Sequence, residues 1–282
     1  MSAPKSLKQQ IADYIEGPDP RLPVFNPVAL ELQEVLRNEN VNASSIEAAV
    51  GKDPALVAQI LRLANSSIYA GLHEITTMHQ ALMRLGSKQV SRLATAAAQL
   101  SLYQSKDALV ASYMTGLWQQ AYASALGASW IAEKSGYRDV AEAAFLAGLL
   151  HDVGKLLILN AIEDFTAKQQ LAQAPPRTLV DEMIESLHSE YGHLLMTRWN
   201  LPNVYCVVGR DHHNADFKQD QVLLIMVRLL DQVCARLGIG CCANPQVVPA
   251  ASPEAQALGL NDIQMAELEI MLEDSMLVPQ AA

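Results

Sequence analysis

Apolar residues recur every three or four positions along most of this chain. Leu56, Ile60 and Leu63 show this spacing clearly, and it is typical of helices that bury one face. No stretch of four or more residues alternates convincingly between apolar and polar, as a half-buried strand would. The pattern therefore predicts an all-α protein.

The first part of the chain predicts short helices separated by tight turns. Residues 1–20 are expected to form a lead-in, and irregular chain continues to residue 26 because Gly and Pro interrupt it. Asp53 and Thr77 have the positions of N-caps, Thr77 with a capping-box partner at Gln80, and Gly86 is expected to break the chain. We expect residues 21–105 to form one compact unit, with helices over residues 26–36, 44–50, 54–70, 77–85 and 87–100.

The second part predicts longer helices. Asp139 and Glu142 again have capping-box spacing, Pro202 has the position of a helix start, and Gly238 that of a helix end. We expect residues 106–240 to form a helical bundle, with helices over residues 107–136, 139–151, 178–188, 194–199, 202–212 and 221–237. The region 241–282 is expected to contain a loop over 241–253 and an acidic amphipathic helix over 260–277.

Composition narrows the class of protein. Half of the 282 residues are apolar but only 5% are aromatic, so Ala, Leu and Val dominate, which suits close-packed helices. The net charge is -10 and no run of Lys and Arg occurs, which disfavours binding to duplex nucleic acid. No signal peptide and no membrane-spanning run is apparent, so we expect a cytoplasmic protein whose four cysteines are free thiols.

A sparse series of His and Asp residues carries the candidate chemistry. Each lies on or at the end of a predicted helix, and helices of a bundle can direct such groups to one interior point. Imidazole and carboxylate are ligands for divalent metals, but the same groups also serve as helix caps and polar core residues. From spacing alone both interpretations stay open for His151, Asp152, His188, His212, His213 and Asp231. His73 and His79 are expected at the surface, and His193 is left out because it points partly away from His188.

Several segments resemble one known family, the HDOD domain, an HD-related output domain of bacterial signalling proteins. The resemblance covers roughly residues 20–240 and includes the segment around His151 and Asp152. The matching segments are Leu22-Pro23, Asp53–Leu56, Leu61–Ser66, Ala81–Gly86, Ala147–Lys155, His188–Gly192, Trp199–Pro202 and His212-His213.

The resemblance implies an HD-domain-like helical bundle preceded by a compact N-terminal helical unit. It also implies kinship with the HD phosphohydrolases and the HD-GYP cyclic-di-GMP phosphodiesterases, in which such residues hold one or two metals. Mapped by motif, His151 and Asp152 match the His-Asp pair, the later histidines match further ligands, and Asp231 matches the late Asp. On this basis one metal would use His151, Asp152 and Asp231. A second would use His188, His212 and His213, with Asp152 as a bridge.

The chain departs from the enzymes at two points. Where they carry a His on the helix before the His-Asp pair, this chain has Gln120, whose amide oxygen is a weaker ligand than imidazole. The Gly-Tyr-Pro element after the double His is also missing, because Asn214 follows His213. Both departures disfavour a cyclic-di-GMP phosphodiesterase.

Two functions remain. The first is a signalling output or scaffold module without catalysis, acting on a signalling protein or on a small phosphate-containing ligand. The second is a metal-dependent phosphohydrolase acting on a nucleotide or another phosphate ester. In it a divalent metal (Mn, Fe, Mg, Ni or Zn) would lower the pKa of a bound water, with Asp152 and Lys155 as candidates for catalytic roles.

Overall fold

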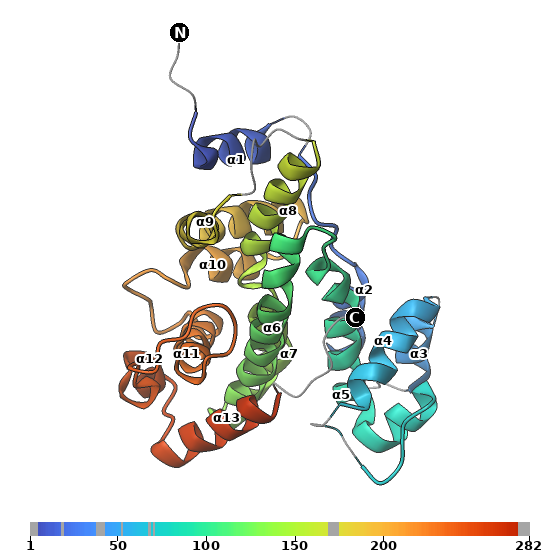
Figure 1. Cartoon of the computed structure of the whole chain (residues 1–282). Helices are drawn as coiled ribbons and strands as arrows, with labels where there is room; N and C mark the ends of the chain where they lie inside the picture. Colours follow the sequence, from blue (N-terminus) through green and yellow to red (C-terminus); the bar gives the residue numbers. More distant parts are fainter. Residues whose placement is uncertain are drawn as a thin grey trace.

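The computed structural model describes residues 5–17, 20–37, 43–51, 53–66, 69, 71–168 and 175–275. Within these ranges the chain forms α-helices and short 3-10 helices and no strand, which confirms the all-α prediction. In Figure 1 the N-terminal helices α2 to α5 lie on one side of the central helices α6 and α7, and α11 to α13 lie on the other.

The helices follow one another in a simple order. The first part contains α1 (Leu7–Glu16), α2 (Val28–Arg37), α3 (Ala43–Val50), α4 (Pro54–Ala64), α5 (Met78–Gln99) and the 3-10 helix η2 (Leu100–Tyr103). The second part begins with α6 (Ala108–Lys134), η3 (Arg138–Val140), α7 (Ala141–Leu150), α8 (Val153–Ala167) and α9 (Arg177–Arg198). It ends with α10 (Asn203–Asp211), α11 (Val222–Leu237), η4 (Pro249–Ala251), α12 (Pro253–Ala257) and α13 (Asp262–Ser275).

Local signals place several helix ends as predicted. The Asp53 carboxylate accepts hydrogen bonds from the backbone N–H groups of Ala55 and Leu56, at 2.9 and 3.1 Å, and so caps α4. Thr77 and Gln80 form a reciprocal capping box at the start of α5. Gly86 has φ 79° and ψ 161°, so it breaks the helical path inside α5, as expected.

Other local predictions are wrong, because tertiary contacts decide them. Residues 7–16 form the helix α1 instead of irregular chain. The two helices expected over 178–199 are one continuous helix, α9. The capping box at Asp139 does not form, because the Glu142 carboxylate accepts hydrogen bonds from Nε and Nη2 of the buried Arg92 on α5, at 3.2 and 2.9 Å. The last helix ends at Ser275, and residues 276–277 of the prediction lie outside the described part.

Glycines set the closest approaches in the central bundle. A Cβ placed on Gly148 of α7 would lie 2.3 Å from the backbone oxygen of Ser124 on α6. A Cβ on Gly154 would lie 1.9 Å from the backbone oxygen of His188, and one on Gly192 would lie 3.4 Å from the backbone nitrogen of Gly154. The start of α8 therefore touches the backbone of α9, and this contact needs Gly154 in particular.

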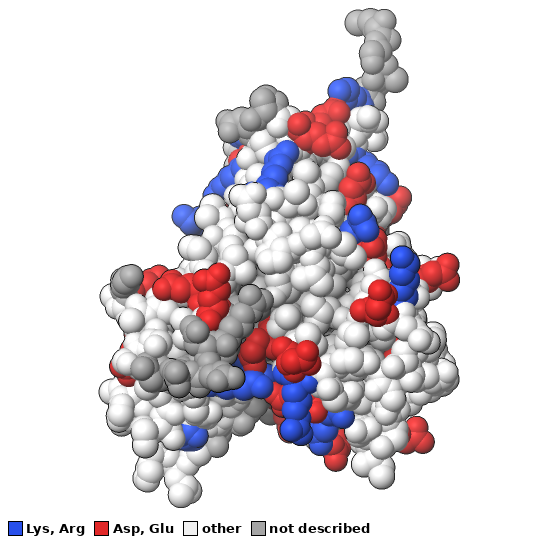
Figure 2. All heavy atoms as spheres, turned by 180° about the vertical axis from the view of Figure 1, so that it is seen from behind, with Lys and Arg blue, Asp and Glu red and all other residues white. Residues whose placement is uncertain are grey.

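The most apolar stretch of the chain lies inside the fold. Residues Arg138–Ala167 are long and apolar enough to cross a membrane by composition, but the most apolar part of this stretch is 94% buried within the protein. It is therefore a core element in this structure. On the face shown in Figure 2, acidic and basic side chains are interspersed, and no large basic patch gathers there.

Candidate metal centre

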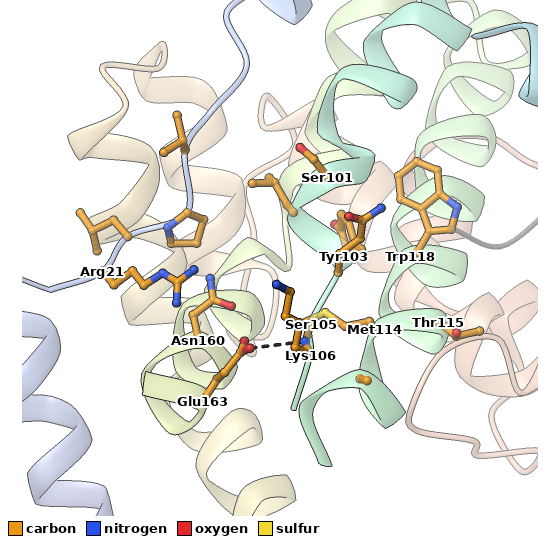
Figure 3. A pocket seen from close by; sticks show the side chains of 16 residues that line it. Arg21, Ser101, Tyr103, Ser105, Lys106, Met114, Thr115, Trp118, Asn160 and Glu163 are labelled. Atoms are coloured by element: carbon orange, nitrogen blue, oxygen red, sulfur yellow. Dashed lines mark hydrogen bonds between the residues drawn. The ribbon is translucent and has the colours of Figure 1, made fainter. Parts of the chain in front are cut away.

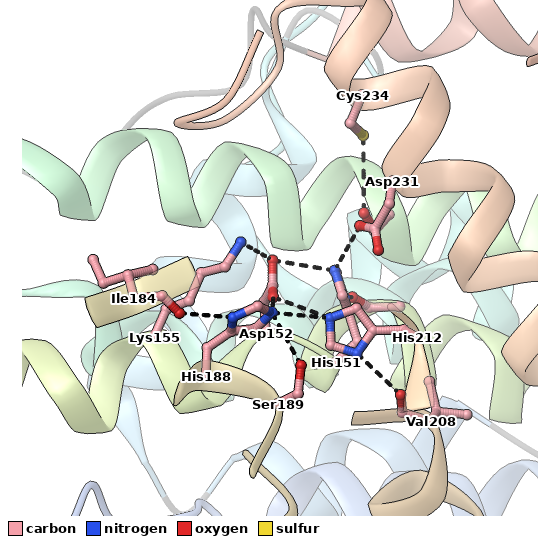
Figure 4. A network of polar contacts seen from close by, with 12 residues as sticks. His151, Asp152, Lys155, Ile184, His188, Ser189, Val208, His212, Asp231 and Cys234 are labelled. Atoms are coloured by element: carbon pink, nitrogen blue, oxygen red, sulfur yellow. Dashed lines mark hydrogen bonds and ion pairs between the residues drawn. The ribbon is translucent and has the colours of Figure 1, made fainter. Parts of the chain in front are cut away.

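Six of the predicted side chains converge in the second half of the molecule. His151 and Asp152 occupy the junction between α7 and α8, His188 is on α9, and Asp231 is on α11. His212 and His213 directly follow α10. Figure 4 shows side chains from these separate elements pointing toward one another. We call these six residues the His/Asp cluster.

One half of the cluster, here called the charged group, consists of His151, Asp152 and Asp231. One possible ligand atom from each residue lies within 4.8 Å of the others. The His151 Nδ1–H donates to the Gly148 carbonyl at 2.7 Å, which turns Nε2 toward the carboxylates. Nε2 lies 3.1 Å from Asp231 Oδ1 and 3.3 Å from Asp152 Oδ2. The α7 backbone therefore fixes the orientation of the ring.

The other half, the histidine group, consists of His188, His212 and His213, which also lie within 4.8 Å of one another. The His188 Nδ1–H donates to the Ile184 carbonyl at 2.7 Å, and the His212 Nδ1–H donates to the Val208 carbonyl at 3.1 Å. The two Nε2 atoms then face each other at 3.2 Å. If both rings are neutral, two lone pairs meet there, and only a shared proton or a metal cation makes that contact favourable.

Asp152 lies between the two groups. Its Oδ1 is 3.5 Å from His188 Nε2 and 3.6 Å from His212 Nε2, and its Oδ2 accepts a hydrogen bond from Lys155 Nζ at 2.5 Å. Among the described residues, neither Asp152 Oδ1 nor Asp231 Oδ2 has a hydrogen-bond partner, although both atoms are buried. A buried carboxylate oxygen without a partner is costly, so these two atoms are suited to a further cation.

The pKa values of His151 and His188, one from each group, are shifted in opposite directions. Burial alone would lower the pKa of His151, but the charges of Asp152 and Asp231 outweigh it and raise that pKa to about 10. Burial would raise the pKa of Asp231, but the charge of His151 lowers it to about 2. Burial, opposed only in part by the charge of Asp152, lowers the pKa of His188 to about 4. At neutral pH the charged group is therefore ionised, and His188 is neutral.

Lys155 belongs to the charged group electrostatically. Its burial would lower the pKa of the ammonium, but the adjacent Asp152 carboxylate raises it instead. The pKa of Asp152 is held well below its usual range, because Lys155 and His151 outweigh the effect of burial. The sequence made Lys155 a candidate for a catalytic role, and the structure places it in a buried ion pair with Asp152.

The donor set fits a divalent metal in composition. His151 Nε2 and one oxygen each of Asp152 and Asp231 would hold one ion, and the three Nε2 or Nδ1 donors of the histidine group would hold another. Such an ion would lower the pKa of a bound water and polarise a phosphoryl oxygen.

Gln120 occupies a different environment. A Cβ on Gly240 would lie 2.5 Å from Gln120 Oε1, so the amide rests against the backbone of the loop after α11. No hydrogen bond among the described residues joins Gln120 to the His/Asp cluster. The remaining histidines lie apart: His73 and His79 are exposed, as predicted, and the His193 Nδ1–H donates to the Cys206 carbonyl at 3.1 Å.

The sequence did not predict two features of the site. Gly154 and Gly192 allow the backbone of α8 to meet that of α9 beside His188. Tyr103 is buried near the cluster, since burial and then the charge of Asp152 raise the pKa of its phenol. The Gly that follows the His-Asp pair was visible as a signal for a close backbone approach, but nothing in the sequence links residue 103 to residue 152.

Comparison with known proteins places the chain among related sequences. The family model described as HDOD domain matches residues 22–215. An "Uncharacterized protein" of Treponema pallidum is 31% identical over 212 residues, which make up 74% of this chain and 40% of that protein. The chain therefore spans less than half the length of this curated relative.

Solved structures show the same fold at low identity. A Geobacter sulfurreducens HDOD domain protein with unknown function has a TM-score of 0.72 at 21% identity, over 95% of each chain. A "Putative metal-dependent phosphohydrolase" from Shewanella amazonensis SB2B has a TM-score of 0.67 at 17% identity, over 96% of this chain and 98% of that one. A "Putative signal transduction protein" from Marinobacter aquaeolei VT8 has a TM-score of 0.65 at 22% identity, over 98% of this chain and 60% of that one.

Proposed function

Because this chain belongs to the HDOD family, we propose that it is a signalling output or scaffold module whose His/Asp cluster performs no catalysis. The observation that carries this proposal is the internal charge balance of the cluster. Two cations, His151 and Lys155, face two anions, Asp152 and Asp231. The four side chains form a neutral set that is paired without any added ion.

This pairing makes metal binding harder. A metal in the charged group needs a neutral His151, so the proton held at a pKa of about 10 must leave first. The metal must also compete with the Lys155 ammonium for Asp152 Oδ2. Gln120 offers an amide in place of an imidazole, and this amide rests against the backbone at Gly240. We therefore expect weak metal occupancy of the charged group at neutral pH, and the cluster then serves to hold α7, α8, α9 and α11 together.

A module of this kind acts by binding. We propose that it works in the cytoplasm on a signalling protein or a small phosphate-containing ligand, without contacts to nucleic acid or membrane. The net charge of -10 supports the exclusion of nucleic acid.

The test combines metal content with turnover. The protein is purified without chelator, its metal is measured by mass spectrometry, and hydrolysis of bis(p-nitrophenyl) phosphate is assayed with added Mn²⁺. We expect at most one metal ion per chain, held by the histidine group, and no turnover above the Asp152→Asn variant. Gln120→His is the positive comparison, because it restores the imidazole that the resemblance to the HD enzymes implies at this position, and it should raise the metal content. Stoichiometric metal with turnover that Asp152→Asn abolishes would overturn the proposal.

The second candidate is a metal-dependent phosphohydrolase for a phosphate ester. It is favoured by the facing Nε2 atoms of His188 and His212 at 3.2 Å and by the two unpartnered carboxylate oxygens. In it the His/Asp cluster would hold one or two divalent ions, with Asp152 between them. Lys155 would pair with a substrate phosphate. The same assay decides, because this candidate requires turnover that depends on both metal and Asp152.

A further inference from the structure

A cavity of about 890 Å³ opens beside α8, where Asn160 and Glu163 form part of its wall. Its walls come from the segment 21–24, from η2 and the turn after it, from the start of α6, and from Asn160 and Glu163 on α8. The volume is within the range of small-molecule sites. None of the six residues of the His/Asp cluster lines it.

Hydrogen bonds hold both ends of the wall formed by residues 21–24 against the bundle. At one end the Arg21 backbone N–H donates to the Tyr14 hydroxyl at 2.7 Å, and that hydroxyl donates to Asp164 Oδ2 at 2.7 Å. At the other end the Trp199 Nε1–H donates to the Pro23 carbonyl at 3.0 Å. Two of these three hydrogen bonds join residues that are 150 and 176 positions apart in the sequence, so the cavity is held open by tertiary structure.

The charges at the cavity favour an anion. Arg21 and Lys106 contribute two cations and Glu163 one anion, in a chain whose net charge is -10. Within the described part of the chain, neither the Arg21 guanidinium nor the Lys106 ammonium forms a salt bridge, although the charge of Arg21 helps to lower the pKa of nearby Asp164. The Glu163 carboxylate instead accepts a hydrogen bond from the Lys106 backbone N–H, at 3.4 Å. Figure 3 shows Arg21 and Asn160 pointing toward the gap that Lys106 borders from the opposite side.

The rest of the lining offers both apolar surface and hydrogen-bonding groups. Buried Tyr103, Met114 and Trp118 close the inner end, and the indole and phenol rings meet edge to face with centroids 5.3 Å apart. Hydroxyl and amide groups lie around them, on Ser101, Gln104, Ser105, Thr115 and Asn160. This combination suits a ligand with a flat ring, several polar atoms and an anionic group.

We propose that this cavity binds a nucleotide, whose phosphate lies between Arg21 and Lys106 and whose base rests against the inner apolar end. Arg21 offers a planar fork of donors and Lys106 a point charge, and together they match a phosphate dianion. The identification of this nucleotide with the small phosphate-containing ligand of the signalling module rests on the proposed function, whereas nucleotide binding is measured without it.

The experiment is isothermal titration calorimetry of the full chain in the presence of chelator, so that no metal contributes. The probes are AMP and GMP, with adenosine and inorganic phosphate as comparators. We expect a Kd of roughly 100 µM or tighter for at least one nucleotide and at least tenfold weaker binding of both comparators. Arg21→Ala and Lys106→Ala should each weaken binding about tenfold. Lys106→Arg should retain it, and Thr115→Trp should block it by filling the cavity.

Lys218→Ala is the matched control, because Lys218 is exposed and lies outside the cavity. Circular dichroism checks that each variant is folded. Absence of nucleotide binding up to millimolar concentration overturns the proposal. So does binding that survives in both Arg21→Ala and Lys106→Ala, and binding that only His151→Ala removes would place the nucleotide at the His/Asp cluster instead. None of these results depends on turnover, so the failure of this inference and the failure of the proposed function are separate outcomes.

Discussion

The charged group and the histidine group both contact the Asp152 carboxylate, but the pKa values of the buried His151 and His188 are shifted in opposite directions. His151 is buried next to two carboxylates and keeps its proton up to a pKa of about 10. His188 is as deeply buried, but its nearest ring neighbours are histidines, and its pKa falls to about 4. Two imidazoles a few ångströms apart therefore differ in charge because one has anionic neighbours on two sides.

This difference bears on function. A protonated imidazole cannot ligate a metal, whereas a neutral imidazole can. The histidine group is therefore ready to accept a cation, and the charged group must first release a proton. A site of this type has two unequal halves, and the weaker half limits any reaction that needs two ions.

The largest expected effect is the removal of charge from the shared carboxylate. Asp152→Asn keeps the shape of the side chain but leaves Lys155 and His151 short of a counter-ion in a buried site. We expect a loss of about 3–5 kcal/mol in the free energy of unfolding at pH 7, measured by urea denaturation. His188→Gln in the uncharged half should cost only about 1–2 kcal/mol. Equal losses for the two variants would show that the charge difference is absent.

The contact that brings the two halves together offers the next test. Gly154→Ala places a Cβ 1.9 Å from the backbone oxygen of His188, so α8 and α9 must separate. We expect a loss of about 3 kcal/mol. Gly192→Ala is the matched control on the facing helix, because its Cβ would have an ordinary contact at 3.4 Å, and helix propensity favours Ala. If Gly154→Ala unfolds at the same urea concentration as the wild type, the close contact does not exist.

The smallest effect is a pH dependence of opposite sign for the two halves, in metal-free protein. His151 has a raised pKa in the folded state, so its contribution is complete below pH 6.5 and is lost as the pH rises toward 10. His188 has a lowered pKa, so its contribution is complete above pH 6.5 and is lost as the pH falls toward 4. Each should change the free energy of unfolding by about 1.5 kcal/mol over 1.5 pH units.

Urea denaturation between pH 5 and pH 9, in the presence of chelator, measures both limbs. His151→Gln should flatten the alkaline limb only, and His188→Gln should flatten the acid limb only. A variant that flattens the wrong limb would contradict the assignment of charge to that half.

The sequence predicted what depends on local spacing and on family motifs. Asp53, Thr77 and Gly86 act within a turn of their own position, so their roles follow from neighbouring residues. The convergence of His151 with Asp231 was expected because the resemblance orders these residues along the chain. Whether they bind a metal stays a prediction.

What the sequence could not predict depends on partners far along the chain. The capping box at Asp139 is lost to Arg92, which is about fifty residues away. Gly192 and His193 lie between the two helices expected from the sequence, but α9 continues through them, and Gly192 faces the start of α8 at an ordinary contact distance. The segment around Arg21 has no regular secondary structure, as expected, but the sequence could not predict that hydrogen bonds with Tyr14 and Trp199 fix its position.

The fastening of the N-terminal segment has a consequence for synthesis on the ribosome. Pro23 accepts its hydrogen bond from Trp199, which is translated 176 residues later. Because translation adds about 5–20 residues per second, α1 and the irregular segment after it wait on the order of 10–35 s until the residues that bind them have been synthesised. This segment is thus made early but is among the last to dock.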